Sequence, residues 1–583
     1  MTATSDQSLV FSQRPAPWLY VLVLAALAFL AYLLTSAFGH ALLGAPSLSE
    51  RLSVLAFCLF VMIAAFSAFH NIAVLVFGAS VKLSRRRLRV RQLRSGGDAG
   101  RPTAGLPRPR VALLYTTCND FSEDSVFSLV SQHYEAFTVY ILDDGDDPSC
   151  AQRIDAFAAR HGSRVRVVRR RSRRGYKAGN LNNCLRNIAV HEPYFALADA
   201  DEVLPPDFLQ RAVQILDAHP SIGFVQASHG HNPRTATCFA AELGPGVDAH
   251  YRWYYDYRNR FGFVMLLGHG ALIRRAVWES IGGFPEVVSE DLAFAIRARD
   301  AGWRGYFAAD LLCLEDFPAT LGRFRVRHMK WVCGTCQLLA TEFGRLLQSR
   351  RITLVEKVDV LVAISPLVFS AVVLPLTIAL NWGLATFVEL PATAGIAAST
   401  ATLSHHALSS RYVALGGAGL FFLMTLGTFA STLIFVVDMA NQPRQLAVFI
   451  AKSVVVYGAL VGLSVIGVAS YLLTGRARFF VTGESDHRTR KAPSGLKGLP
   501  RSHPDRYLVR CIEATIGASI LGFAFGHAFH ASLVGLGFGV LGHSILHQAD
   551  WNVRLSQWLV AVPPLLVFGD VLIGGLLAAG IRV

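Results

Sequence analysis

The chain has 583 residues, of which 52% are hydrophobic and 16% charged, and its formal net charge is +15. Several runs of about twenty or more mostly apolar residues exclude a purely soluble protein, because a run of that length crosses a bilayer as a helix. The distribution of the positive charge argues against a nucleic-acid partner. The basic residues gather beside apolar runs, as expected for cytoplasmic residues near anionic lipid headgroups.

Two apolar segments, 18–38 and 52–79, come first along the chain and predict a transmembrane hairpin within residues 1–81. Basic residues crowd behind the second segment, which places that end of the hairpin in the cytoplasm. Residues 82–109 are therefore predicted to be a basic cytoplasmic linker. The basic residues are Lys82, Arg85, Arg86, Arg87, Arg89, Arg91 and Arg94.

Residues 110–356 have the pattern of a soluble α/β domain, in which short apolar runs alternate with helical periodicity. This alternation predicts a mainly parallel sheet with helices on both faces and a ligand site at the carboxyl ends of the strands. The expected strands are Val111–Tyr115, Phe137–Leu142, Val165–Val168, Tyr194–Ala198 and Ile222–Val225. The expected helices are Ala151–His161, Lys177–Ala189, Asp207–His219 and Leu292–Ala301.

Apolar segments return after residue 356. Residues 357–475 are predicted to be transmembrane or interface helices, 476–506 a cytosolic loop with a basic linker, and 507–583 C-terminal transmembrane helices. A cytosolic 476–506 requires an even number of crossings, so either 446–473 lies along or re-enters the membrane, or 385–400 also crosses. The candidate spans are 358–384, 413–437, 446–473, 508–525, 531–546 and 555–577. Four histidines in the last spans are expected to pack helices, with pore lining or metal binding as alternatives: His527, His530, His543 and His547.

Acidic residues follow two of the expected strands directly. Asp143 and Asp144 come after one strand, and Asp199 and Asp201 come after another. Residues i and i+2 of a strand share a face, so Asp199 and Asp201 can converge on one point. Paired carboxylates are suitable ligands for Mg²⁺ or Mn²⁺, which would neutralise a departing diphosphate. An isolated Asp-x-Asp is more often a helix cap or a solvated turn, so its context decides.

Two further segments carry candidate chemistry. Glu290 and Asp291 stand before a helical pattern, where Asp291 is either a general base for an acceptor hydroxyl or part of a helix N-cap. Several cations lead into Trp331, which is either a platform for a sugar ring or an interfacial aromatic anchor. These cations are Arg323, Arg325, Arg327 and Lys330. A separate basic run, 169–174, is either a solvated or lipid-facing surface or an aid to phosphate binding.

This ordered set of motifs resembles glycosyltransferase family 2, and within it the processive membrane synthases of cellulose, curdlan, chitin and hyaluronan. Five further segments support the resemblance. They are the nucleotide-contacting turn 116–120, the Lys-Ala-Gly-Asn-Leu-Asn segment 177–182, the Asp-Glu-Val-Leu-Pro continuation 201–205, the acceptor-side segment 268–284 and the gating-like segment Phe479-Phe480-Val481-Thr482.

The resemblance implies a GT-A-like cytosolic domain inserted in a helical transmembrane bundle of a bacterial inner membrane. The reaction it implies is inverting, processive transfer from a UDP-sugar, with UDP-glucose the preferred donor, to a growing β-linked polysaccharide that is exported. By the same resemblance Asp291, Lys330 and Trp331 are catalytic, and Asp199 and Asp201 hold Mg²⁺ or Mn²⁺. The implied substrate contacts are Thr117, Asp120, Asp143, Asp144, Lys177, Asp199, Glu290, Arg327 and Thr482. Membrane lipids are expected partners, and a periplasmic export partner is compatible with the resemblance, although no residue points to one.

Two departures from the family pattern leave alternatives open. The family's Gln-x-x-Arg-Trp stands here as Arg327-His328-Met329-Lys330-Trp331, so Lys330 keeps the charge but loses the bidentate geometry of arginine. Glu484 stands where the gating segment usually has a lysine. The alternatives are a non-processive transferase that acts on a lipid carrier and a degenerate domain that serves as a scaffold or export subunit.

Overall fold

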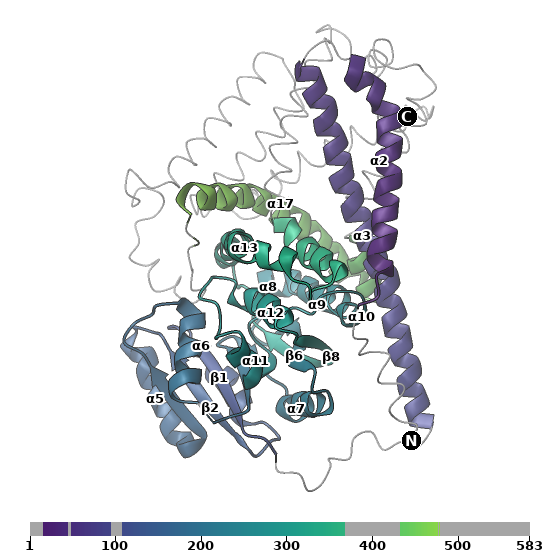
Figure 1. Cartoon of the computed structure of the whole chain (residues 1–583). Helices are drawn as coiled ribbons and strands as arrows, with labels where there is room; N and C mark the ends of the chain where they lie inside the picture. Colours follow the sequence, from purple (N-terminus) through teal and green to yellow (C-terminus); the bar gives the residue numbers. More distant parts are fainter. Residues whose placement is uncertain are drawn as a thin grey trace, which may run out of the picture. The chain divides into compact units, whose positions relative to one another are not determined.

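The structure is a computed structural model that describes residues 15–44, 48–94, 108–189, 191–367, 432–475 and 477 (Figure 1). The chain divides into two compact units. One unit comprises Met1–Leu19, Val74–Ser365 and Gly475–Lys491, and the other comprises Tyr20–Ala73, Pro366–Thr474 and Ala492–Val583. The first unit contains the predicted α/β domain, and each unit is described by itself.

A mixed sheet of eight strands forms the centre of the first unit, in the order β3-β2-β1-β4-β7-β6-β8-β5. The neighbours β3, β2, β1 and β4 are all parallel, and so are β6 and β8. The prediction of a mainly parallel sheet is thus confirmed, whereas the antiparallel strand β7 between β4 and β6 was not expected. The strands are β1 Val111–Thr117, β2 Phe137–Asp143, β3 Val165–Arg169, β4 Tyr194–Asp199, β5 Glu202–Val203, β6 Ile222–His231, β7 Ala271–Arg274 and β8 Arg304–Glu315.

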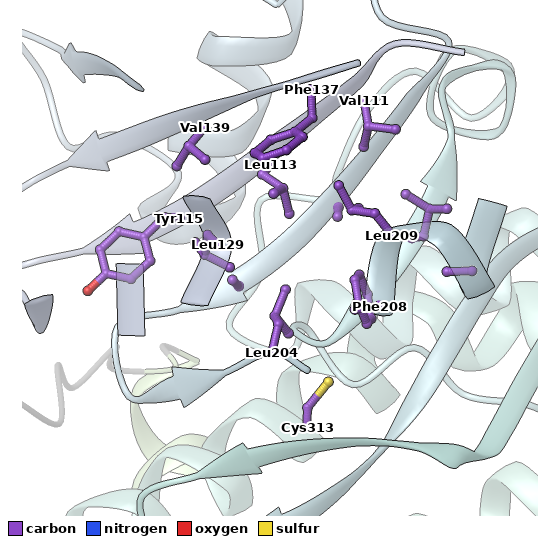
Figure 2. Packing of buried hydrophobic residues seen from close by; sticks show 14 of the residues in the cluster. Val111, Leu113, Tyr115, Leu129, Phe137, Val139, Leu204, Phe208, Leu209 and Cys313 are labelled. Atoms are coloured by element: carbon purple, nitrogen blue, oxygen red, sulfur yellow. The ribbon is translucent and has the colours of Figure 1, made fainter. Parts of the chain in front are cut away.

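Side chains that alternate along the strands build two cores, one on each face of the sheet. Leu113 packs with Leu129 and Phe208 on one face (Figure 2). Ile154 belongs to the same core, so α4, α5 and α7 cover this face. Leu114 packs on the opposite face with residues of α6, α11, α12 and α13. Helices on both faces are what the strand–helix alternation predicts, because a parallel sheet must bury both of its surfaces.

The helices begin where side chains satisfy free backbone amides. Ser122 caps α4, Asp147 caps α5 with Pro148 in its first turn, and Thr320 caps α13. The four expected helices of this domain are present, with ends that differ by up to three residues. The helices are α4 Glu123–Val130, α5 Pro148–His161, α6 Tyr176–Asn187, α7 Phe208–Ala218, α8 Cys238–Leu243, α9 Pro245–Tyr254, α10 Arg258–Phe261, α11 Arg275–Ser280, α12 Glu290–Asp300 and α13 Leu321–Gln348.

Three long helices account for most of the remaining described residues: α2 Trp18–Gly44, α3 Leu48–Arg94 and α17 Pro443–Thr474. Two stretches in the described part, Trp18–Ser36 and Val61–Arg86, are long and apolar enough to cross a membrane. Helix α17 covers the expected segment 446–473, which is therefore helical. The expected spans 385–400, 508–525, 531–546 and 555–577, the gating-like segment and the four C-terminal histidines lie outside the described residues.

The basic end of α3 belongs to the first unit and packs on its α9–α10 region. Lys82 Nζ lies 3.3 Å from the centre of the Trp253 ring, and Arg85 pairs with the buried Asp256 at 2.7 Å. The first part of the predicted linker, as far as Arg94, is thus a continuation of α3. Its cations contact the α/β domain in addition to any role beside a membrane.

Candidate functional site

The carboxyl ends of three parallel strands lie in register at one edge of the sheet. Thr117 at the end of β1 is paired with Asp143 at the end of β2, and Thr116 is paired with Asp199 at the end of β4. Parallel strands present their carboxyl ends at the same edge, so polar side chains from distant parts of the sequence meet there. The acidic motifs thus lie at the strand ends, where they were expected.

Asp199 is held by two donors. Thr116 Oγ1 donates to Asp199 Oδ1 over 2.7 Å, and Lys177 Nζ lies 2.5 Å from the same oxygen. Burial alone would raise the pKa of Asp199, but Lys177 outweighs it and lowers this pKa. Burial would lower the pKa of Lys177, but Asp199 and Glu290 raise it. Both partners are therefore charged at neutral pH.

Asp201 contrasts with Asp199. Within the described part of the chain its carboxylate takes part in no hydrogen bond, and Asp199 Oδ2 also accepts none. The surrounding protein partly shields the Asp201 carboxylate from water, and this desolvation, together with the neighbouring Asp199, raises the pKa of Asp201 to about 7. Two adjacent carboxylates with unused oxygens repel each other, and a hard divalent cation relieves that repulsion. The donor set therefore fits Mg²⁺ or Mn²⁺.

Asp143 and Asp144 each have a cation of their own. Asp143 Oδ2 lies 2.7 Å from Arg169 Nε, and its Oδ1 accepts the Gly145 amide over 2.8 Å. Asp144 forms a bidentate pair with Arg170, at 2.8 and 2.6 Å. The basic run 169–174 therefore contributes two arginines that fix the carboxylates at the end of β2, a use that sequence analysis did not anticipate.

Hydrogen bonds join the turn after β1 to the turn after β2. Thr117 Oγ1 donates to Asp120 Oδ1 over 2.8 Å. Asn119 has a φ of +67°, which asparagine tolerates better than most residues. Its side chain bonds Asp146 in both directions, at 2.7 and 2.9 Å. The two turns therefore form one rigid rim, with Thr117 and Asp120 on its β1 side and Asp143 on its β2 side.

Glu290 and Asp291 begin helix α12. Burial raises the pKa of both carboxyls, and Asp291 adds to the effect on Glu290. Lys177 and Lys330 act in the opposite direction on both. Asp291 Oδ1 accepts the Leu292 amide at 2.7 Å, whereas the Ser289 side chain makes no cap hydrogen bond. Asp291 therefore accepts one free amide of the first turn, and among the described residues its Oδ2 accepts no hydrogen bond.

Gly268 brings the strand-end carboxylates and the α12 carboxylates into one site. Its carbonyl accepts from Lys177 Nζ at 3.0 Å. A methyl group added at Gly268 would lie 3.2 Å from Asp291 Oδ2, and the φ of +85° favours glycine in any case. Lys177 therefore links Asp199 on one side of this glycine with the surroundings of Asp291 on the other.

Helix α13 contributes Arg327, Lys330 and Trp331. The Trp331 side chain is 46% exposed. The Arg327 guanidinium lies 4.8 Å from the Trp331 ring centre, and the rings of Phe317 and Phe324 lie 4.8 and 5.3 Å from it. Arg327 therefore supports an exposed aromatic surface, while Lys330 is the cation that acts on Glu290 and Asp291. Thr482, the remaining expected contact, lies outside the described residues.

Four residues to which the sequence analysis assigned no role of their own lie next to this site, although two of them stand in the named segments 201–205 and 268–284: Glu202, His229, His269 and Glu315. No spacing in the sequence links them, because they come from β5, β6, the turn before β7 and the end of β8. The only local signal is the pair of glycines on either side of His269, which both have positive φ.

Comparisons with known proteins identify what this domain is similar to. The family described as "Glycosyltransferase like family 2" matches residues 109–334. Among curated relatives, glucomannan 4-beta-mannosyltransferase 2 of Arabidopsis thaliana is 27% identical over 281 residues, which are 44% of this chain and 53% of the relative. Glucomannan 4-beta-mannosyltransferase 1 of Oryza sativa subsp. japonica is 27% identical over 327 residues, 53% of this chain and 61% of the relative. The chain spans about half the length of the curated relatives it matches.

Among solved structures, the mannosyltransferase PcManGT from Pyrobaculum calidifontis, in complex with GDP-Man and Mn²⁺, is 21% identical. The alignment covers 64% of this chain and 98% of that chain, with a TM-score of 0.37. TarS 1–349 of S. aureus in complex with UDP-GlcNAc is 15% identical, with 64% and 95% covered and a TM-score of 0.30.

Proposed function

Because residues 109–334 form a family 2 glycosyltransferase domain, we propose that the chain transfers a hexose from a nucleoside-diphosphate sugar to the end of a β-linked polysaccharide. One observation carries the proposal. Lys177 Nζ contacts both Asp199 and the Gly268 carbonyl, and Asp291 lies against Gly268. A site for a metal-bound diphosphate and a candidate base for an acceptor thus adjoin each other.

The reaction is a single displacement. Asp291 accepts the proton of an acceptor hydroxyl as that oxygen forms a bond to C1 of the donor sugar, and the bond from C1 to the diphosphate oxygen breaks. The nucleoside diphosphate leaves with the bonding electrons. Attack from the face opposite the leaving group converts an α-linked donor into a β-linkage. A base with a raised pKa suits this role, because proton transfer is most effective near the operating pH.

Asp199 and Asp201 are the residues that would hold Mg²⁺ or Mn²⁺. When bound, the cation neutralises the charge that develops on the departing diphosphate. Lys177 adds a second positive charge from the protein itself, and its pairing with Asp199 keeps its ammonium in place before the donor binds.

The nucleotide end of the donor is assigned to the rim of the two turns. Thr117, Asp120, Asp143 and Asp144 line it, and the arginine pairs hold the last two carboxylates in place. The acceptor end is assigned to Lys330, next to Glu290 and Asp291, and to Trp331, whose exposed ring offers an apolar face for a sugar. Arg327 acts through Trp331, and Thr482 is proposed to close over the donor.

Processive extension with export is the finer proposal. It is supported by the exposed Trp331 ring and by two helices long enough to cross a membrane. Because of these helices, membrane lipids are proposed as partners and a bacterial inner membrane as the location. The donor is proposed to be UDP-glucose by the resemblance to cellulose synthases. The named mannosyltransferase relatives make a mannose donor the alternative that the experiment must include.

The full-length protein in nanodiscs, with Mn²⁺ or Mg²⁺, is offered radiolabelled UDP-glucose, GDP-mannose and UDP-N-acetylglucosamine separately. The variant Asp291→Asn is compared with Asp300→Asn, which changes the same functional group at the other end of α12. Long polymer from one donor, made by wild type and Asp300→Asn but not by Asp291→Asn, supports the proposal and names its sugar.

Other products lead elsewhere. Short glycolipids would replace the processive proposal with transfer to a lipid carrier. No turnover of any donor, or turnover that does not depend on Asp291, would contradict the assigned chemistry and favour the scaffold alternative.

A further inference from the structure

Four side chains that the proposed reaction does not use form a cluster beside the site, here called the histidine cage: Glu202, His229, His269 and Glu315. Glu202 and His229 are buried at 0% and 1% exposure. His269 and Glu315 keep a small exposed fraction, 16% and 13% of their side chains. The cage therefore extends from the interior of the sheet to the surface of the site.

The two imidazoles lie between the two carboxylates. His269 Nδ1 is 3.2 Å from Glu202 Oε1, and its Nε2 is 3.5 Å from Glu315 Oε2. His229 Nε2 is 3.5 Å from Glu202 Oε1, and its Nδ1 is 3.8 Å from Glu315 Oε2. The rings are stacked, with centroids 4.2 Å apart and planes 13° apart. Each ring of the stack thus has a carboxylate at both ends.

A bound metal ion is one explanation of this grouping, because ligand atoms of Glu202, His229 and His269 lie within 4.8 Å of one another. The orientation of the rings argues against it. The lone pair of an imidazole nitrogen lies in the ring plane, and a metal bound by two histidines lies near both planes. Nearly parallel stacked rings point their lone pairs side by side, so an ion between His229 and His269 would be well out of at least one plane.

A protonated His269 explains the same contacts. Both ring nitrogens lie within ion-pair distance of a carboxylate oxygen, and these opposite charges favour the imidazolium, although His269 Nδ1 and Glu202 Oε1 are not aligned as a hydrogen bond. Burial would lower the pKa of His269, but Glu202, Asp199 and Glu315 outweigh it and raise this pKa to about 10. Burial and the neighbouring His269 lower the pKa of His229, which stays neutral. The cage therefore holds one cation between two carboxylates.

The cage is tied to the site through the turn at residues 268–270. Gly270 N donates to Glu202 Oε2 over 3.1 Å, and the His269 carbonyl accepts from Gln226 Nε2 at 2.9 Å. At the other end of the turn, the Gly268 carbonyl accepts from Lys177 and the glycine abuts Asp291. Movement of this turn would therefore displace Lys177 and Asp291, on which the proposed reaction depends.

We propose that His269 is a positioning residue for the transfer described above, an inference that rests on the proposed function. Its ring, held between Glu202 and Glu315, fixes the turn at residues 268–270. The fixed turn keeps Lys177 and Asp291 at the spacing that the displacement needs. His269 takes no part in bond making or breaking.

The test uses the full-length protein with His269→Gln, the double variant His269→Gln/Glu315→Gln, and the control His161→Gln at the far end of α5. Amide hydrogen exchange of peptides covering residues 264–274 is measured first, because it needs no activity. His269→Gln is expected to speed exchange in these peptides, since it removes the cation that lies between Glu202 and Glu315 and leaves only Arg327 to act on Glu315. The double variant, which removes one carboxylate as well, is expected to regain most of the protection.

Kinetics provide the second measurement. A misplaced catalytic group costs on the order of a hundredfold in rate, so His269→Gln is expected to lower kcat by roughly tenfold to a hundredfold with little change in the donor KM. The double variant recovers part of kcat, and His161→Gln resembles wild type. If the wild type turns over no donor, the proposed function fails, while the exchange measurement still decides whether His269 holds the turn.

Three results would overturn the inference. One is exchange in 264–274 that His269→Gln leaves unchanged. Another is an unaltered kcat in an active enzyme. The third is a stoichiometric metal in the purified chain that His269→Gln removes and Glu315→Gln removes further, because losing a second ligand cannot rescue a metal site.

Discussion

The two sides of the site treat their carboxylates differently. On the donor side, Asp143 and Asp144 each pair with one arginine of the next strand end, at distances of 2.6 to 2.8 Å. On the acceptor side, Glu290 and Asp291 stand next to each other at the start of α12, and burial raises the pKa of both. Lys177 lies between the two sides and compensates carboxylates on both.

This difference separates the carboxylates that recognise a ligand from those that can accept a proton. A carboxylate with its own arginine is held in a fixed orientation by charge-assisted hydrogen bonds, which suits a surface that recognises a ligand. A carboxylate whose pKa is raised is poised to accept a proton near neutral pH, which suits a general base. If the comparison is correct, changes on the acceptor side affect the transfer rate, and changes on the donor side affect nucleotide affinity.

The largest effect is expected from Lys177→Met, because this side chain serves both sides. It leaves the partly buried Asp199 without its cation, and breaking a buried pair typically costs about 3–5 kcal/mol. Transfer is expected to fall by roughly a hundredfold to a thousandfold, the usual cost of removing one preorganised electrostatic donor. Initial rates with saturating donor measure this, with Lys357→Met as the control. A loss of less than about tenfold would remove Lys177 from the account.

Removal of the divalent cation is the next test. Chelation is expected to abolish transfer, and Mn²⁺ or Mg²⁺ to restore it. Asp201→Asn is expected to weaken the apparent cation affinity by at least about tenfold, the lower end of what even outer ligand partners contribute. Cation titrations of the rate compare it with Asp207→Asn, a change on an exposed part of the same segment. Activity that survives exhaustive chelation would contradict the assignment of Asp199 and Asp201.

The pH profile sharpens the comparison directly. A base must be deprotonated to accept a proton, so a raised pKa moves the loss of activity to higher pH. Burial raises the pKa of Asp291, so transfer is expected to be lost at a higher pH than an ordinary aspartate would give, by roughly tenfold per unit of pH once this group is mostly protonated. Nucleotide binding at saturating Mn²⁺, measured over the same range, is expected to change far less because the donor-side carboxylates stay paired. If the transfer rate and the nucleotide affinity fell together as pH is lowered, the proposed difference between the two sides would be wrong.

The smallest effect is expected from Arg170→Gln. It removes the bidentate partner of Asp144 and also the donors to the Arg174 and Tyr176 carbonyls, so its effect on the nucleotide is indirect. The dissociation constant for the nucleoside diphosphate is expected to rise by roughly tenfold or less, since charge-assisted hydrogen bonds are worth about 1.5–3 kcal/mol and the effect is indirect. Calorimetry compares it with Arg173→Gln, whose contact with Asp146 is 3.6 Å long and exposed. Equal effects from both variants would mean that the specific pair is irrelevant.

Much of the donor side could be predicted from the sequence because its information is local. Asp143 and Asp199 follow continuous apolar runs, and such runs become buried parallel strands whose carboxyl ends share an edge. Lys177 lies in a helix that begins shortly after β3, so its arrival at the same edge follows from the same topology. Strands β2 and β4 each end one residue later than expected, which brings Asp143 and Asp199 into the strands themselves, whereas β6 ends six residues later than expected.

The acceptor side was less accessible to sequence analysis because its contacts are long-range. Strand β7 is short and antiparallel, and only the fold reveals that the turn before it brings Gly268 to Asp291. Arg327 stands where the family's Gln-x-x-Arg-Trp has a glutamine, and only the fold shows that three aromatic rings lie around its guanidinium. The partners of His269 come from two other strands, and no spacing in the sequence connects them.

The measurement that tests the central claim most directly separates donor binding from transfer in Asp291→Asn. Nucleotide-sugar affinity is measured by calorimetry and single-turnover transfer by product analysis, in the same nanodisc preparation with Mn²⁺. The account predicts that transfer falls by roughly a hundredfold to ten-thousandfold, the range for loss of a general base, while affinity stays within about threefold of wild type. Affinity that falls in proportion to transfer, or transfer that persists, would contradict the division of the site into a donor side that binds and an acceptor side that reacts.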